Sequence, residues 1–366
     1  MRELPAQVLY MSADINILQK DAIALLQELI ATPSFSKEEE KTAGILARFF
    51  SVRDIEAYWV GNNIYASNRY FDPNKPSILL NSHHDTVKPN PQYTRDPFAA
   101  TIDNGKLFGL GSNDAGGCLV SLIAVFLYFN DRKDLKYNLV IAATAEEEIS
   151  GTGGIEYTLP YLPTIEAAIV GEPTQMQMAV AERGLMVLDC ISHGKAGHAA
   201  RNEGENAIYK AMKDIDWFRH YHFEKDSPLL GPCKMSVTVI ETENKAHNVV
   251  PATCKFVVDT RINELYSFEE LIDIIRNHVQ CEVKPRSTRL RSTAIALDHP
   301  LVKAGTALGR SYYGSPTTSD KALMPFPALK MGPGDSARSH TADEYIYVDE
   351  INKGIELYIQ LLNQVI

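Results

Sequence analysis

The sequence predicts an α/β protein in which a mixed sheet is covered by helices on both faces and a smaller domain is inserted. Strand-length apolar runs such as 138–143 and 167–170 alternate with helical patterns. Uninterrupted apolar strands of this kind are typical of a sheet that is buried on both faces. Between residues 185 and 284 the predicted order changes to β-α-β-β-α-β, which is the ferredoxin-like arrangement.

The elements before the insertion follow from the spacing of apolar and turn residues. Apolar residues at helical spacing predict a helix over 15–30, which Pro33 stops. The run 36–39 has the pattern of a capping box, so we expect a second helix to begin there and to pass through Ile45, Leu46 and Phe49. The next predicted elements are strands at 57–60, 63–66 and 77–80, a glycine-rich loop at 109–117, and an apolar helix at 118–129.

The inserted domain is about a hundred residues long, as expected for a compact unit. Its predicted elements are strand 186–192, helix 205–221, strands 234–240 and 254–261, helix 268–279 and strand 281–283. After Arg291 the α/β character returns, with helices predicted around 301–308 and 350–364. We therefore expect one domain made of 1–179 and 292–366, and a second made of 180–291.

Composition excludes several classes of protein. At 366 residues, with 45% hydrophobic and 22% charged residues, the chain is ordinary for a globular protein of two domains. A formal charge of −10 argues against nucleic acid as a partner. We see no leader-type segment and no apolar run of membrane-spanning length, so we expect no membrane partner and a cytoplasmic location. The five cysteines are scattered and odd in number, which favours reduced thiols.

Acidic and histidine side chains recur at the ends of predicted strands or in the loops that follow. These groups are His83-His84-Asp85, Asp114, the run 146–148, Glu172 and His340. Taken alone, each is more simply a polar turn or a solvated face. Three groups directly follow apolar strands, however, and so emerge at one edge of the sheet. Two imidazoles with several carboxylates suit zinc or a neighbouring divalent metal, and so many carboxylates favour two metals that share one aspartate.

Five motifs resemble those of the M20 metallopeptidase family, particularly its acetylornithine deacetylase and succinyl-diaminopimelate desuccinylase branch. The run 82–85 resembles the family's G/S-H-x-D, and 111–117 its G-x-x-D-x-K-G-G. The run 144–148 is similar to T-A-D-E-E and 171–173 to G-E-P, and His340 matches the histidine of the C-terminal segment. The resemblance covers nearly the whole chain in family order. It implies a zinc-peptidase-like catalytic domain and an inserted dimerisation domain.

The resemblance implies two zinc ions per chain, although cobalt or manganese would accept the same ligands. One zinc would be held by His83, Asp114 and Glu172, and the other by Asp114, Glu148 and His340. Asp85 would orient His83, and Glu147 would be the general base. His84 stands at the variable position of its motif and is interpreted as structural or supporting.

The inserted domain resembles the family's domain in the loop 193–200, whose second histidine reaches the active site of a partner subunit. This implies a homodimer in which His198 donates a hydrogen bond to the oxyanion. Arg183, Asn248 and Arg261 resemble contacts to a substrate carboxylate, and Ser319 lies in a run, 317–320, that resembles a substrate-pocket loop. Without the resemblance, His198 is an exposed loop histidine and Arg261 equally well ends its strand in a salt bridge.

The chain departs from the family pattern at two places. Lysine is common after the bridging aspartate, where this chain has Ala115-Gly116, and Glu146 stands where aspartate is common. The resulting hypothesis is a di-zinc amidohydrolase that removes an acetyl or succinyl group from the Nα of a small amino acid, such as ornithine or citrulline in arginine biosynthesis. The alternatives are a di- or tripeptidase of the same family and a non-catalytic homologue that binds metabolites.

Overall fold

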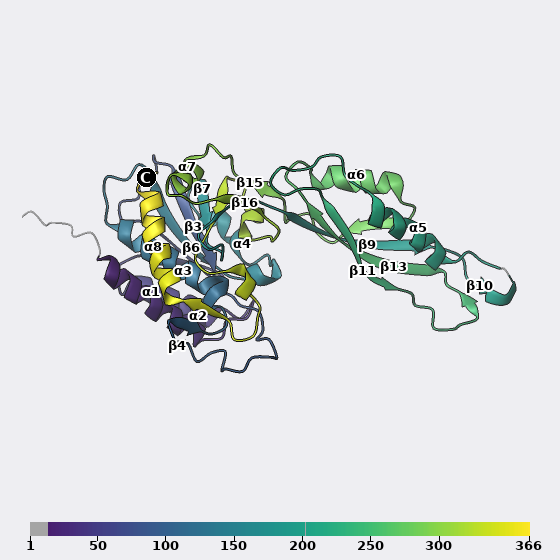
Figure 1. The fold of residues 1–366 in the computed structure, drawn as a ribbon, viewed down its shortest axis with the longest axis horizontal. Helices are drawn as coiled ribbons and strands as arrows, with labels where there is room; N and C mark the ends of the chain where they lie inside the picture. Colours follow the sequence, from purple (N-terminus) through teal and green to yellow (C-terminus); the bar gives the residue numbers. More distant parts are fainter. Residues whose placement is uncertain (1–13, 202) are drawn as a thin grey trace, which may run out of the picture. The chain divides into compact units, whose positions relative to one another are not determined.

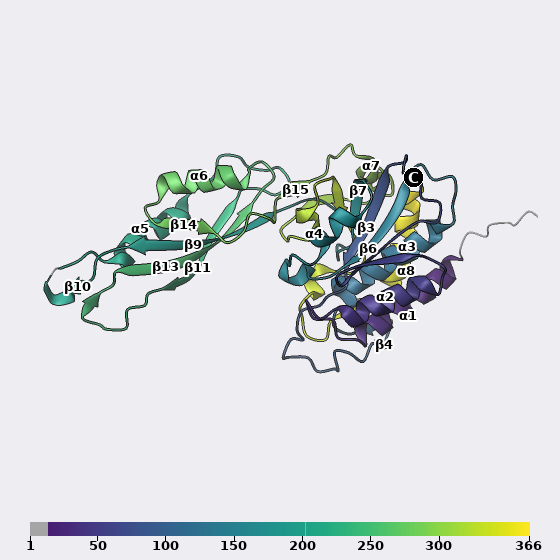
Figure 2. The same cartoon turned by 180° about the vertical axis from the view of Figure 1, so that it is seen from behind.

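The computed structural model describes residues 14–201 and 203–366, and the chain divides into two compact units. The first contains the chain up to Val180 together with Ile295–Tyr312 and Ser319–Ile366. The second contains Ala181–Ala294 and Tyr313–Thr318. Figures 1 and 2 show the elements of both units, coloured along the sequence.

A mixed sheet, most of whose strands belong to the first unit, has strand order β1-β2-β6-β3-β7-β17-β8-β15, with β16 paired with β8. The strands are β1 (Ala57–Val60), β2 (Asn63–Ser67), β3 (Ser77–His83), β6 (Asn138–Thr144), β7 (Ile165–Val170), β8 (Met178–Glu182), β15 (Thr293–Ala294), β16 (Tyr312–Ser315) and β17 (Ala328–Lys330). β3 runs parallel to β6 and β7, whereas β2 is antiparallel to β6. This confirms the predicted α/β fold with a mixed sheet.

Helices and turns cover both faces of this sheet, and every residue of β3 and β6 is buried. On one face α3 (Gly117–Asn130) contacts β3 and β6 and is itself covered by α1 (Ile15–Ile30) and α8 (Val348–Leu362). On the other face Ile155, in α4 (Ile155–Thr158), and Met324 pack against Leu79 and Val140. Burial from both sides explains why these strands are apolar throughout.

Smaller elements complete the first unit. They are α2 (Glu40–Ser51), α7 (Pro300–Ala307) and an antiparallel sheet of β4 (Thr101–Asp103), β5 (Lys106–Phe108) and β18 (Tyr345–Tyr347). The capping-box prediction at 36–39 is wrong. Helix α2 begins at Glu40, its N-cap Glu39 makes no side-chain cap bond, and the Ser36 hydroxyl donates instead to Asp85. Ser36 therefore does not cap α2, and its hydroxyl makes a long-range hydrogen bond instead.

One described helical stretch, Ser112–Asn130, is long and apolar enough to cross a membrane by length and composition alone. No apolar run of that length is expected from the sequence. In the structure 83% of the stretch is buried inside the protein, where α3 packs between the sheet and two other helices. Its apolar composition is accounted for by this core position.

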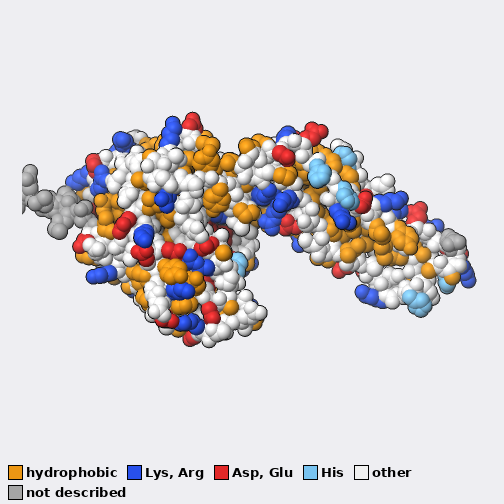
Figure 3. Space-filling view, viewed as in Figure 1, with side chains coloured by type: hydrophobic (Ala, Val, Ile, Leu, Met, Phe, Trp, Pro, Cys, Tyr) orange, Lys and Arg blue, Asp and Glu red, His pale blue; other side chains and the backbone are white. Residues whose placement is uncertain are grey.

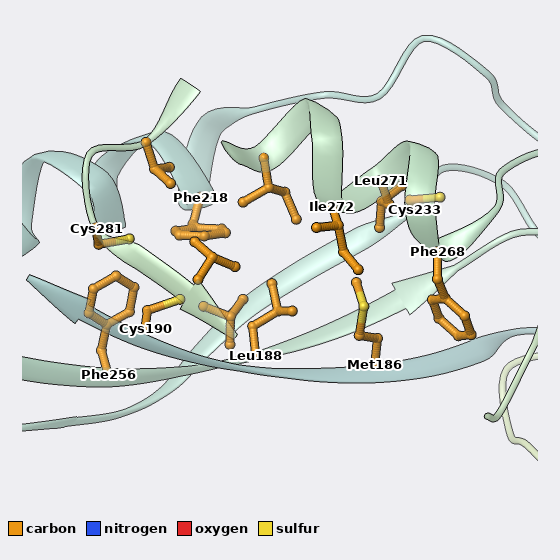
Figure 4. Close-up of a cluster of buried hydrophobic side chains, with 14 of the residues drawn as sticks. Met186, Leu188, Cys190, Phe218, Cys233, Phe256, Phe268, Leu271, Ile272 and Cys281 are labelled. Atoms are coloured by element: carbon orange, nitrogen blue, oxygen red, sulfur yellow. The ribbon is translucent and has the colours of Figure 1, made fainter. Parts of the chain in front are cut away.

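The second unit is a four-stranded antiparallel sheet with order β11-β13-β9-β14 and two helices packed on one face. Its elements are β9 (Gly184–His193), α5 (Ala207–His220), β11 (Lys234–Glu241), β13 (Thr253–Ile262), α6 (Phe268–His278) and β14 (Glu282–Pro285). This is the predicted β-α-β-β-α-β order. Inward side chains such as Leu188, Phe256 and Leu271 form its core, which Figure 4 shows in close-up. All five cysteines are buried free thiols.

One segment lies outside the expected domain boundaries. Residues Tyr313–Thr318 were assigned from the sequence to the larger domain, but the structure groups them with the second unit. The backbone N–H of Arg183 donates to Ser315 O, and the Thr318 hydroxyl donates to Arg183 O. These bonds tie the segment to the start of β9, a contact that local sequence does not encode.

Candidate active site

Three parallel strands deliver polar side chains to one edge of the sheet of the first unit. β3 ends at His83, β6 ends shortly before the run 146–148, and β7 ends shortly before Glu172. Because parallel strands point the same way, their carboxyl ends meet at one edge, where α/β sheets place their sites. The predicted convergence of these loops follows from that topology.

Two groups of side chains have the composition of metal ligands. In the first, His83 Nε2 lies 3.3 Å from Asp114 Oδ1 and 3.9 Å from Glu172 Oε1. In the second, His340 Nε2 lies 2.9 Å from Glu148 Oε2 and 3.6 Å from Asp114 Oδ2. Within each group the ligand atoms lie within 4.8 Å of one another. Asp114 belongs to both groups, one oxygen toward each, as a bridging carboxylate would.

The protonation pattern of His83 fits metal ligation. Its Nδ1 lies 3.0 Å from the Asp85 carbonyl oxygen and 3.3 Å from Asp85 Oδ1. Both neighbours are acceptors, so Nδ1 carries the proton and Nε2 is left as a ligand atom. Burial alone lowers the pKa of His83, but the carboxylates of Asp114 and Asp85 outweigh it and raise that pKa well above its ordinary value, so a metal ion at Nε2 would take the place of a proton.

The concentration of negative charge also fits a bound cation. Burial, followed by repulsion from Asp114, raises the pKa of Glu172 to about 8. The hydrogen bond to Glu148 raises the pKa of His340 to about 9. Carboxylates crowded in this way repel one another unless protons or metal ions offset their charge. With nitrogen and oxygen donors only, the two groups suit zinc, cobalt or manganese.

Asp85 connects the two ends of the site. Besides its contact with His83, its carboxylate accepts hydrogen bonds from the backbone N–H groups of Glu147, at 3.0 Å, and Glu148, at 3.2 Å. The Ser36 hydroxyl donates to the same carboxylate at 2.7 Å. Burial raises the pKa of Asp85, but the hydrogen bond from His83, the charge of His83 and the hydrogen bond from Ser36 together outweigh it, so the pKa is lowered. One buried carboxylate therefore orients a ligand of the first group and holds the loop that carries Glu148.

Glu147 lies beside the first group, with Oε2 3.9 Å from His83 Nε2. Burial, followed by repulsion from Glu172, raises its pKa well above the ordinary value for a glutamate. A carboxylate that takes up a proton readily and sits next to possible metal positions has the properties of a general base.

Two buried carboxylates of the site were missed from the sequence. Glu344 accepts hydrogen bonds from the backbone of the Asp114 loop. Asp320 accepts a hydrogen bond from the Thr144 hydroxyl at 2.7 Å, and burial raises its pKa to about 6. Neither stands at the end of an apolar run, and their partners lie more than 170 positions away in the chain. Sequence proximity therefore offered no signal for these contacts, although Asp320 ends the run 317–320 that resembles a substrate-pocket loop.

The predicted substrate contacts are spread over both units. Ser319 is buried in the first unit, at the start of the turn Asp320–Leu323. In the second unit, the guanidinium of Arg183 donates to the carbonyls of Leu230 and Pro232, and Arg261 forms an ion pair with Asp259. The salt-bridge alternative for Arg261 is thus the arrangement observed. Both guanidinium groups are engaged within their own unit, and their substrate roles stay predictions.

His198 and Asn248 lie together in the second unit. The short strand β10 (Gly197–His198) pairs with β12 (Val249–Val250), and the Ala199 N–H donates to Asn248 O. His198 is exposed, and its Nδ1 accepts a hydrogen bond from the Ala200 N–H. Accepting at Nδ1 places the proton of a neutral imidazole on Nε2, so the ring presents an N–H donor to solvent.

Comparisons with known proteins point to one family. Residues 79–364, more than half of the chain, match the model of peptidase family M20/M25/M40. A succinyl-diaminopimelate desuccinylase from Cereibacter sphaeroides is 28% identical over 69% of this chain and 70% of its own length. One from Wolbachia pipientis is 26% identical over 93% of this chain and 92% of its own length.

Solved structures share the fold at low identity. Aminopeptidase PepT from Bacillus cereus superimposes with a TM-score of 0.75 at 17% identity, covering 95% of this chain and 98% of its own. The YXEP protein of Bacillus subtilis, described as a dinuclear metal binding peptidase, gives 0.70 at 16% identity, with 94% and 98% covered. The curated relatives named above are desuccinylases, so the acetylornithine deacetylase branch is not confirmed.

Proposed function

The chain belongs to peptidase family M20, whose members are metal-dependent hydrolases of amide bonds, and we propose that it removes an acyl group from the nitrogen of a small amino acid. The observation that carries the proposal is the pair of ligand groups joined by Asp114, with Glu147 beside them. This arrangement suits hydrolysis by an activated water. We propose two Zn²⁺ per chain, with Co²⁺ or Mn²⁺ as possible replacements.

The residues of the protein have separate roles in hydrolysis. Metal ions at the two positions would polarise the amide carbonyl and lower the pKa of water. Glu147 takes the proton from the attacking water and delivers it to the leaving nitrogen, so that the amine departs uncharged and the carboxylate is regenerated. Asp85 keeps Glu147 in place by accepting a hydrogen bond from its backbone N–H.

We propose that the working form is a homodimer. Strand β11 is an edge of its sheet and pairs only with β13 among the described strands. Val239 and Ile240 on β11 and Tyr209 and Met212 on α5 are exposed. Figure 3 shows hydrophobic side chains gathered over β11 and β13 on the visible face of this unit. An unpaired edge next to exposed apolar side chains favours association with a second copy. His198 of one chain would then donate its Nε2–H to the oxyanion in the other.

The substrate class follows from the relatives and the motifs together. The desuccinylase relatives support an acylated amino acid over a long peptide. Acetyl or succinyl derivatives of ornithine and citrulline, within arginine biosynthesis, remain our proposal beside succinyl-diaminopimelate. We also propose that the enzyme works in the cytoplasm.

Kinetics with a defined metal content test this function. The chain would be stripped of metal, reloaded with Zn²⁺ or Co²⁺, and assayed on N-acetylornithine, N-acetylcitrulline, N-succinylornithine, N-succinyl-diaminopimelate and a panel of di- and tripeptides. We expect the highest kcat/KM on an N-acyl amino acid and no turnover before metal is added. Faster cleavage of the peptides would replace the proposal with a peptidase, and two bound metals without any turnover would indicate a non-catalytic protein.

A further inference from the structure

Glu344 lies buried, only 2% exposed, four residues after His340 and directly before β18. Its Oε1 accepts hydrogen bonds from the backbone N–H groups of Asn113, at 2.9 Å, and Asp114, at 3.0 Å. Its Oε2 accepts one from the Gly111 N–H at 3.2 Å. The backbone carbonyl of Glu344 also accepts from the Gly109 N–H at 3.0 Å. One residue thus accepts hydrogen bonds from four backbone N–H groups of the loop that presents Asp114.

These hydrogen bonds satisfy backbone N–H groups that the conformation of the loop leaves without helical partners. Asp114 has φ −118° and ψ 98°, which is not helical, so the turn η1 (Ser112–Gly116) does not form a regular helical hydrogen-bond ladder. Buried N–H groups without acceptors destabilise a fold, and a buried carboxylate without donors does the same. Glu344 and the loop satisfy each other.

The same bonds leave the Asp114 carboxylate available. An aspartate in a loop commonly accepts hydrogen bonds from nearby backbone N–H groups. Here the N–H groups of Gly111, Asn113 and Asp114 are taken by Glu344, and the two Asp114 oxygens face His83 and His340 instead.

Glu344 also joins two ligand-bearing segments. Asp114 and His340 are two of the three donors of the second group, and Glu344 connects the loop of one to the segment of the other. The Asn113 side chain reinforces this connection, because it donates to Asp335 O and accepts from Asp335 N, both at 3.0 Å. In the first group only Asp114 comes from these segments.

We propose that Glu344 is a positioning residue that sets the second metal position by holding the Asp114 loop against the segment of His340. The proposal rests on the metal-dependent function proposed above. Replacing Glu344 should weaken the second metal far more than the first. Groups that support metal ligands typically contribute about 10–100-fold to metal affinity, and we expect a loss of that size at the second position.

Metal titration of the full-length chain tests the proposal. Metal-free wild type and Glu344→Gln would be titrated with Zn²⁺ by calorimetry and with Co²⁺ by visible absorption, and each variant's Tm would be measured. Glutamine has the same shape, but its amide NH₂ would face a backbone N–H. We expect two binding events in the wild type, and in the variant an almost unchanged first event with a second event about 10–100-fold weaker. We also expect kcat to fall more than KM rises.

The neighbouring Asp343 offers a matched control. Its carboxylate accepts hydrogen bonds from the backbone N–H groups of Thr94, at 2.9 Å, and Arg95, at 3.0 Å. These bonds are similar to those of Glu344, but the loop that they hold carries no proposed metal ligand. Asp343→Asn should lower Tm without changing either metal affinity. If Glu344→Gln does not fold, Asn113→Ala removes the second connection without leaving a buried charge, and should weaken the second metal in the same direction.

The outcomes separate this inference from the proposed function. Equal second-metal affinity in the wild type and in the folded variants would overturn the role of Glu344 even if the enzyme is fully active. A wild type that binds two metals but hydrolyses nothing would refute the proposed function, while selective loss of the second metal would still support Glu344. A wild type that binds fewer than two metals would overturn both.

Discussion

Adjacent glutamates in one loop have different surroundings and therefore different chemistry. Glu148 lies at 2.9 Å from His340, in the second ligand group. Glu147 faces the first group, where burial and Glu172 raise its pKa. Glu146 turns away, and its carboxylate accepts a hydrogen bond from the Gly153 N–H. Within three positions the backbone separates the proposed ligand Glu148 and the proposed base Glu147 from Glu146, because Asp85 accepts hydrogen bonds from the N–H groups of the first two.

The first prediction concerns the base. Glu147→Ala should lower kcat by about 10²–10⁴-fold, which is the usual contribution of a general base. Its metal content should equal that of the wild type, because Glu147 is in neither ligand group. Metal analysis and initial rates on the best substrate measure both.

Glu146→Asp serves as the control from the same loop and should keep most of the activity. Undiminished turnover of Glu147→Ala would refute the mechanism. Loss of metal from that variant would indicate that Glu147 is a metal ligand instead.

Among the elements, α7 shows how one local contact sets a pH response. His299 is its N-cap, and the unprotonated Nδ1 accepts a hydrogen bond from the Leu301 N–H. Burial lowers the pKa of His299 below 6.5, and nearby Glu166 and Asp298 oppose this only in part. In the unfolded chain the same imidazole protonates near 6.5.

The stability of the wild type should therefore fall relative to His299→Asn as the pH drops below 6.5. The unfolded state binds a proton there that the folded state resists, so acid favours unfolding. Asparagine caps a helix without titrating, and the difference is limited to about 1 kcal/mol, the usual value of a cap. Urea unfolding at about pH 8 and about pH 5 gives the four free energies needed. Equal pH dependence in the two proteins would contradict the role of His299.

For the whole molecule, the open question is whether a complete site needs two chains. The metal ligands and Glu147 come from the first unit, whereas His198 comes from the second. If His198 acts on the partner's site, chains with His198→Ala and chains with Glu147→Ala should each be nearly inactive alone.

Mixing the two chains should restore activity. In a mixed dimer, one site combines an intact Glu147 with an intact His198 from the other chain, so random pairing should restore roughly a quarter of the wild-type rate per chain. Size-exclusion chromatography before and after mixing reports the dimer. Exchange of subunits without recovered activity would count against a contribution in trans.

The sequence predicted those features of the fold that depend on neighbouring residues in the chain. The apolar runs that became β3, β6 and β7 were predicted because a strand buried on both faces must be apolar throughout. The capping box at 36–39 failed because α2 begins only at Glu40, and the Ser36 hydroxyl donates a hydrogen bond to Asp85, 49 positions along the chain. Short strands such as β8 and β17 were missed because their pairing, not their composition, defines them.

The sequence by itself determined the division of the chain into an α/β and a ferredoxin-like part, the motifs at the strand ends and the family they resemble. These depend on periodicity and on residue order, which can be read along the chain. The sharing of Asp114 by two ligand groups was already implied by the resemblance, whereas only the tertiary structure decided that Asp85 holds the glutamate loop and that Glu344 holds the Asp114 loop. Glu344 and Asn113 are 231 positions apart, and a hydrogen bond between such residues exists only after the sheet has brought its loops together.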